Sequence, residues 1–139
     1  MSLITLEINT NGENFYEITN QAKNALSQQH GNIKSGIMYL FIPHTSCALT
    51  ITEAYDPTAV HDIKCFLKHI APESLNFIQH TAEGKDDSPS HMKSILLNHS
   101  LHIPFEDGKL LLGRWQGIFL TEFRTNKHIR KVYLKCIFD

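Results

Sequence analysis

Hydrophobic and polar residues alternate at the start of the chain, and the pattern predicts strands in its N-terminal half. Residues 3–8 alternate with a period of two, which is typical of a half-buried strand. The run Gly36–Pro43 is short and apolar, and it begins with glycine and ends with proline, which favours a buried strand. Extended chain is expected to continue over residues 47–52, after a bend at residues 44–46.

A helical period follows the first strand. Apolar residues recur at helical spacing between Phe15 and Leu26, which predicts an amphipathic helix there. Asn14 and Glu17 have the spacing of a capping box, in which each residue satisfies a free N–H group at the helix start. We therefore expect this helix to begin near Asn14.

Two further helices are indicated by their start signals. Asp56–Pro57 has the sequence of an N-cap followed by a first helical residue, and this helix is expected to end near Ala71–Pro72. Its apolar residues fall within one arc of the helix surface: Val60, Ile63, Leu67 and Ile70. Ser88–Pro89 is a second start signal, and the short helix that follows is expected to run through Leu97.

The last third of the chain has the pattern of strands joined by turns. The expected strands are Leu101–Phe105, Lys109–Leu112, Gly117–Phe123 and Lys131–Phe138. Glu106–Asp107–Gly108 favours a hairpin, and a polar turn is expected at residues 125–128, so the strands would form a meander. The whole pattern predicts one α+β domain over residues 1–139, mainly an antiparallel sheet or sandwich with two to three helices.

Composition narrows the class of protein. The 139 residues carry a net charge of −1, which argues against a general nucleic-acid binder. Gly36–Pro43 is the longest apolar stretch, far below the ~20 residues that a membrane span needs. The first basic residue is Lys23, so a charged secretory leader is not expected, and three cysteines without CxxC spacing disfavour a disulfide framework. We expect a cytoplasmic protein with no nucleic-acid or membrane partner.

Histidine is the unusual residue of this chain. Seven of the nine histidines lie between residues 44 and 102: His44, His61, His69, His80, His91, His99 and His102. His80 and His91 bracket an acidic loop that leads into an expected helix, whose free N–H groups suit a phosphate or carboxylate. With His44 at the end of a strand, three imidazoles and one open position match a catalytic zinc site. The same spacing also allows each histidine to be a surface or capping residue.

Other polar residues are weighed in the same way. His61, Cys65 and His69 share one helix face with lysines, which is typical of a solvated surface. Glu122 stands in an otherwise apolar strand, where a buried carboxylate needs a partner, so it is a candidate site residue. The basic residues between Arg124 and Lys131 are most simply a solvated hairpin turn.

Ordered motifs run through nearly the whole chain. They are His44–Thr45–Ser46, His80–Thr81 with Glu83–Gly84 and Asp86–Asp87, Pro89 with His91 and Lys93–Ser94, Trp115–Gln116–Gly117–Ile118, and Glu122. In these motifs and their order the chain resembles the YjbQ-type family, often called secondary thiamine-phosphate synthase. The resemblance implies a small α+β fold that assembles as a homotrimer, with a histidine-lined site able to hold a metal or an oxyanion.

The resemblance also implies roles for individual residues. The metal ligands would be His44, His80 and His91; the catalytic residues Glu83, Asp87, Lys93 and Glu122; and the substrate contacts Ser88 and Gln116. The expected cofactor is a divalent metal, above all zinc, with magnesium as an ion that accompanies the substrate. The expected substrate is a small phosphorylated metabolite, since the family name implies joining a pyrimidine diphosphate to a thiazole phosphate with release of pyrophosphate. Positive charge near the pyrophosphate would come from Lys93 and the helix start.

Two other interpretations stay open. A non-catalytic module that senses or stores a metal or a small ligand would bind metal tightly and turn over no phosphate substrate. A structural trimer whose histidines cap or bridge subunits would lose assembly, rather than ligand, when those histidines are replaced.

Overall fold

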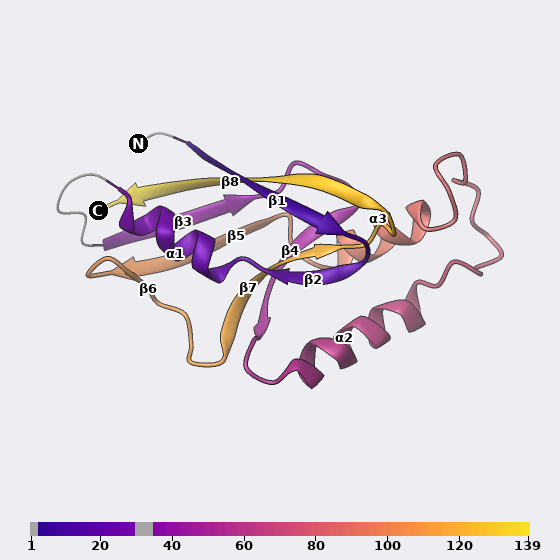
Figure 1. Cartoon of the computed structure of the whole chain (residues 1–139), viewed down its shortest axis with the longest axis horizontal. Coiled ribbons are helices and arrows are strands. Elements are labelled where there is room, and N and C mark those ends of the chain that lie inside the picture. Colours follow the sequence, from indigo (N-terminus) through magenta and orange to yellow (C-terminus); the bar gives the residue numbers. More distant parts are fainter. Residues whose placement is uncertain (1–2, 30–34) are drawn as a thin grey trace.

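Residues 3–29 and 35–139 are described by a computed structural model, in which they form two antiparallel sheets and three helices (Figure 1). The five-stranded sheet has the order β1–β8–β3–β5–β6, and the three-stranded sheet has the order β2–β7–β4. The strands are β1 (Ile4–Asn11), β2 (Asn14–Glu17), β3 (Ser35–Phe41), β4 (Cys47–Glu53), β5 (Ser100–Glu106), β6 (Lys109–Leu110), β7 (Gln116–Glu122) and β8 (Lys127–Phe138). The helices are α1 (Thr19–Ser27), α2 (Pro57–Ile70) and α3 (Asp87–Leu96). The expected α+β fold is confirmed.

The main core lies between the two sheets and beneath α1. On β3, Met38 and Leu40 point into this core and are fully buried, while their neighbours Ile37, Tyr39 and Phe41 are exposed on the opposite face. The expectation of a buried strand here is therefore met on one face only. The outer face of the five-stranded sheet carries an apolar surface at this strand.

The three-stranded sheet is covered on both faces. Ile118 and Leu120 of β7 face the main core, and Phe119 between them packs in a second apolar cluster with Leu67 of α2. Ile70 is 42% exposed, so the predicted apolar arc of α2 is only partly buried. Because both faces of β7 are covered, most of its residues are buried, and the strand ends inside the protein at Glu122.

Two expectations about neighbouring elements were wrong. The predicted C-terminal meander is not formed, because β7 pairs with β2 and β4 while β8 crosses to the other sheet between β1 and β3. The predicted capping box is absent, because Asn14–Glu17 is a strand paired with β7, and α1 begins after Ile18 without a side-chain cap. Alternation shows which residues face a core, but it does not identify the neighbouring strand.

Other local predictions are confirmed. Asp56 caps α2, since its Oδ1 accepts a hydrogen bond from the Thr58 N–H at 2.9 Å, and Pro57 is the first helical residue. Asp107 and Gly108 both have positive φ, 52° and 73°, as a two-residue hairpin between β5 and β6 requires. Within the two described stretches, the helices are all too short or too polar to cross a bilayer.

Candidate functional site

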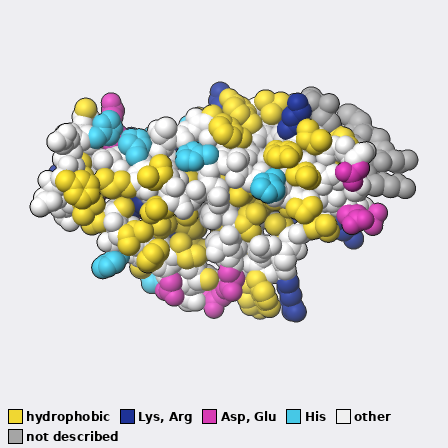
Figure 2. All heavy atoms as spheres, turned by 180° about the vertical axis from the view of Figure 1, so that it is seen from behind, with side chains coloured by type: hydrophobic (Ala, Val, Ile, Leu, Met, Phe, Trp, Pro, Cys, Tyr) yellow, Lys and Arg dark blue, Asp and Glu magenta, His cyan; other side chains and the backbone are white. Residues whose placement is uncertain are grey.

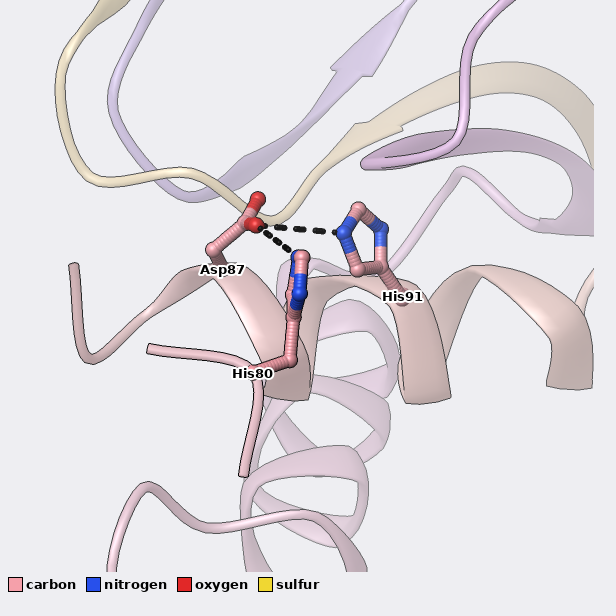
Figure 3. Close-up of side chains that lie close together, drawn as sticks. All are labelled: His80, Asp87 and His91. Atoms are coloured by element: carbon pink, nitrogen blue, oxygen red, sulfur yellow. Dashed lines mark hydrogen bonds and ion pairs between the residues drawn. The ribbon is translucent and has the colours of Figure 1, made fainter. Parts of the chain in front are cut away.

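Helix α3 places Asp87 and His91 one turn apart, and the preceding loop returns His80 beside them (Figure 3). Nε2 of His80 lies 2.8 Å from Oδ2 of Asp87, and Nε2 of His91 lies 3.2 Å from the same oxygen. Residues four apart are neighbours on a helix, so the local sequence suffices to bring Asp87 and His91 together. His80 joins them only because the loop turns back, with Gly84 at a φ of 110°.

The hydrogen bonds of His91 show which of its ring nitrogens carries hydrogen. Nδ1 of His91 lies 2.8 Å from the carbonyl oxygen of Thr45, which can only accept, so the hydrogen is on Nδ1. In a neutral ring the lone pair of Nε2 then faces the Asp87 carboxylate, and two acceptors repel each other. A second ring hydrogen or a cation at this point removes the repulsion. A backbone carbonyl on the far nitrogen is also how proteins orient histidines that bind metal.

Arg124 holds the acidic side of this cluster. Its Nη1 donates to Oδ1 of Asp87 at 3.0 Å, and its Nε donates to Oδ2 of Asp86 at 2.9 Å. Burial raises the pKa of Asp86, but hydrogen bonds from the Thr125 N–H and from Arg124 outweigh burial and hold it below its ordinary value. With Oδ1 bound to Arg124, Asp87 presents Oδ2 to the two imidazoles.

The His80–Asp87–His91 cluster opens onto a hollow of about 450 Å³. The Asp87 side chain is 5% exposed, whereas those of His80 and His91 are 58% and 35% exposed. The hollow is lined by Thr45, His80, Ser88, His91, Ile95 and His99. Its walls therefore combine imidazoles with apolar surface, while the buried Asp87 carboxylate contacts two of the rings that line it.

The donor set fits a zinc ion. Two imidazoles and one carboxylate form a ligand set of catalytic zinc sites, which keep a fourth position open. The three donor atoms lie within 4.8 Å of one another, and the ligands of a tetrahedral zinc are roughly 3.3 Å apart. The separations of 2.8 and 3.2 Å from Oδ2 of Asp87 are close to that value.

His44 does not join this cluster. Its Nε2 accepts a hydrogen bond from the Lys131 N–H of β8 at 3.0 Å. Burial lowers the pKa of His44, and the guanidinium of Arg130 lowers it further, so the ring is neutral near pH 7. The nearby thiol of Cys47 is buried as well, which raises its pKa to about 12. The structure thus brings together two of the three predicted imidazoles, with Asp87 beside them.

Glu122 is buried with a full set of donors. Its carboxylate accepts from Nε and Nη2 of Arg130 at 2.7 and 2.6 Å and from Oγ1 of Thr10 at 2.7 Å. The N–H groups of Phe123 and Arg124 complete the set. Burial raises the pKa of Glu122, but the bonds from Arg130 and Thr10 outweigh burial and hold it below its ordinary value of 4.5. The expected partner of this carboxylate therefore exists, and it is a guanidinium.

The other predicted residues lie in different places. Ser88 lines the hollow, and Glu83 is exposed and offers its main-chain oxygen to Arg124. Lys93 is buried on another part of α3, where its Nζ donates to Glu13 at 2.8 Å. Gln116 begins β7 and bonds to the N–H of Gly113, roughly 20 Å along the strand from Glu122.

Three residues that sequence reasoning did not assign to the site belong to it. Thr45 orients His91, Arg124 orients Asp87, and His99 lines the hollow. The prediction that Arg124 and Arg130 belong to a solvated turn was wrong. Both side chains are largely buried, and their guanidiniums form ion pairs with Asp87 and Glu122. The acidic pair Asp86–Asp87 was a signal for a basic partner, but it did not identify which one.

Comparison with known proteins gives a consistent result. A family model described as UPF0047 protein YjbQ-like matches residues 4–139. A UPF0047 protein of Methanocaldococcus jannaschii is 41% identical over 138 residues, which are 99% of this chain and 95% of that protein. The UPF0047 protein YjbQ of Escherichia coli O157:H7 is 36% identical, covering 92% and 91% of the two chains.

Solved structures extend the similarity to the fold. A conserved hypothetical protein of Thermus thermophilus is 38% identical with a TM-score of 0.85, over 96% of this chain and 99% of that one. A protein of the same family from Clostridium acetobutylicum is 35% identical with a TM-score of 0.83, over 99% and 100% of the chains. A hypothetical protein of Aeropyrum pernix K1, 21% identical with a TM-score of 0.87 over the full length of both chains, shares the fold.

Proposed function

The chain belongs to the YjbQ-like UPF0047 family, and we propose that it is a metal-dependent enzyme acting on a small phosphorylated substrate at the His80–Asp87–His91 cluster. The observation that carries the proposal is the meeting of three donor atoms within 4.8 Å at an open hollow. Asp87 is oriented from behind by Arg124, and His91 by the Thr45 carbonyl, so both present an atom to the same point.

Zinc is the metal that this donor set favours. When bound, the ion supplies a positive charge that polarises a phosphoryl oxygen and stabilises negative charge on a leaving phosphate or pyrophosphate. Ser88, in the first turn of α3, lines the same hollow and is placed to contact an anionic group. Magnesium would bind to the phosphates of a diphosphate substrate and not to these imidazoles, because it prefers oxygen ligands.

The size of the hollow suits a small metabolite, since ligand sites of small molecules have volumes of about 300–1,000 Å³. Formation of thiamine phosphate, in which a pyrimidine diphosphate is joined to a thiazole phosphate and pyrophosphate leaves, is the first reaction to assay. The apolar wall at Ile95 suits the ring of such a substrate, and the imidazoles suit its phosphates.

Assembly as a homotrimer is part of the same proposal. The outer face of the five-stranded sheet exposes Ile37, Tyr39 and Phe41 of β3 next to Ile137 of β8. Hydrophobic side chains also reach the surface in several patches on the side turned away in Figure 1 (Figure 2). Association of copies would remove such surface from water.

The three cysteines are free thiols, which supports a reducing compartment such as the cytoplasm.

Metal content tests the proposal directly. The protein is purified without a histidine tag or chelator, as wild type, His91→Ala and the control His69→Ala, which changes an exposed histidine on α2. We expect near one zinc per chain in the wild type and the control, none in His91→Ala, and zinc-dependent release of phosphate or pyrophosphate from a panel of phosphorylated substrates. Absence of bound metal in the wild type, together with no stabilisation by added zinc, would overturn the proposal.

A non-catalytic metal-binding module is the second candidate. It is favoured by the engagement of Lys93 with Glu13 and of Glu122 with Arg130, which leaves neither side chain free for proton transfer. Stoichiometric zinc that His91→Ala removes, combined with no turnover of any phosphorylated substrate, would select this function over the enzyme.

A further inference from the structure

We infer that Glu122 is a positioning residue for the His80–Asp87–His91 cluster, which it does not touch, because one carboxylate holds the two supports of that cluster. One support is Arg124, which orients Asp87, and the other is the Thr45 carbonyl, which orients His91. The inference rests on the proposed function for its effect on metal binding. Its effect on the imidazole of His91 concerns the metal-free protein.

The first route runs through the chain that follows β7. Oε2 of Glu122 accepts from the N–H of Arg124 at 3.2 Å and from the N–H of Phe123 at 3.1 Å. These bonds hold the backbone where the Arg124 side chain leaves it. From that point the guanidinium reaches Oδ1 of Asp87 and Oδ2 of Asp86. Glu122 thus fixes the backbone position from which the Arg124 side chain extends to Asp87.

The second route runs through Arg130 to the bend at residues 44–46. Nη2 of Arg130 donates both to Oε2 of Glu122 at 2.6 Å and to Oγ of Ser46 at 2.8 Å. The main-chain oxygen of Ser46 also accepts from the Phe123 N–H at 3.3 Å. Ser46 is thereby fixed from two sides, and the peptide before it carries the Thr45 oxygen that receives Nδ1–H of His91.

Burial makes this network rigid. Glu122 and Arg130 are inside the protein, and in the part of the chain that the structure describes every buried side-chain nitrogen and oxygen has a hydrogen-bond partner. A displaced member would leave a charged group without a partner, which is costly in a low dielectric. The bend and the Arg124 backbone therefore hold fixed positions relative to each other. The Thr45 carbonyl and the Arg124 side chain, which extend from them, then fix the positions of His91 and Asp87.

Three variants separate the two routes. Ser46→Ala removes the bond from Arg130 to the bend, Arg124→Gln removes the ion pairs to Asp86 and Asp87 together with the bond to the Glu83 carbonyl, and Glu122→Gln weakens both routes. The readouts are the nitrogen-15 shifts of the His91 ring in metal-free protein, which report hydrogen on Nδ1, and the zinc dissociation constant. Glu13→Gln is the control, because it changes the carboxylate of a different ion pair, with Lys93.

We expect Ser46→Ala and Glu122→Gln to shift His91 away from the Nδ1–H form, and Arg124→Gln to leave that form unchanged. Zinc affinity is expected to fall about 10- to 100-fold in Glu122→Gln, the range typical of groups that orient metal ligands, and less in each of the other two. Glu13→Gln is expected to change neither readout.

The two proposals fail in different ways. If neither the wild type nor any variant binds zinc but the His91 shifts follow this pattern, the proposed metal site is wrong and the positioning role stands. If Glu122→Gln folds, leaves the His91 shifts unchanged and keeps the zinc affinity within twofold of wild type, the positioning role is wrong. Should Glu122→Gln fail to fold, Ser46→Ala decides the matter, because unchanged His91 shifts in that variant would overturn the inference.

Discussion

Asp87 and Glu122 are both buried carboxylates with an arginine partner, but they differ in what completes their hydrogen bonding. Glu122 accepts from Arg130, Thr10 and two backbone N–H groups, all inside the protein. Asp87 gives one oxygen to Arg124 and offers the other to two imidazoles that open onto solvent. The first carboxylate is satisfied by groups inside the protein alone, whereas the second relies on exposed rings, and its contact with Nε2 of His91 is favourable only with a proton or a cation between the two atoms.

This difference separates a structural carboxylate from a binding one. Replacing a member of the Glu122 network exposes a buried charge to an apolar interior and should destabilise the fold. Replacing His80 or His91 removes a ring that solvent already reaches, and Asp87→Asn keeps the size of the buried side chain, so these changes should mainly affect ligand binding. The two regions should therefore differ in how substitutions change stability, metal affinity and the response to pH.

The largest effect is expected for Arg130→Ala. This change leaves the buried Glu122 carboxylate without its guanidinium, and breaking a buried pair on one side costs about 3–5 kcal/mol. Urea denaturation followed by circular dichroism measures the free energy of unfolding. A loss below about 1 kcal/mol, in a variant with the wild-type dependence on urea concentration, would show that the pair does not support the fold.

Asp87→Asn is expected to have its main effect on zinc. An amide oxygen is a much weaker zinc ligand than a carboxylate, so affinity should fall at least about 100-fold. The loss of unfolding free energy should stay smaller than in Arg130→Ala. Calorimetric titration with zinc provides the measurement, and Asp62→Asn, on the surface of α2, is the control. Equal zinc affinity in Asp87→Asn and Asp62→Asn would remove Asp87 from the site.

The smallest effect concerns pH. The pKa of Glu122 is lowered in the folded protein, so the charged carboxylate stabilises the fold fully above its ordinary value of 4.5. That contribution is lost as the pH falls below 4.5 toward the folded pKa. As the pH falls below 5, the free energy of unfolding should therefore decrease more steeply in the wild type than in Glu122→Gln. The comparison is made by urea denaturation across this range, and parallel curves for the two proteins would contradict it.

Prediction from sequence succeeded where the signal is local. The N-cap at Asp56, the hairpin at Asp107–Gly108 and the short helix that carries His91 were all expected, because each depends on residues within one or two turns of chain. It failed at Asn14–Glu17, where pairing with β7 outweighed a helix-start signal. It also failed for the C-terminal meander, since neither β7 nor β8 carries a pattern that identifies its neighbour.

The candidate site divides in the same way. The sequence alone predicted that His80 and His91 bracket an acidic loop containing Asp87, that this loop leads into a short helix carrying His91, and that Glu122 needs a buried partner. Only the tertiary structure decided that His44 bonds to β8 instead of joining the cluster, that Thr45 orients His91 from 46 residues away, and that Arg124 orients Asp87 from 37 residues away. Helical spacing is a property of adjacent turns, whereas these contacts depend on how two sheets bring distant loops together.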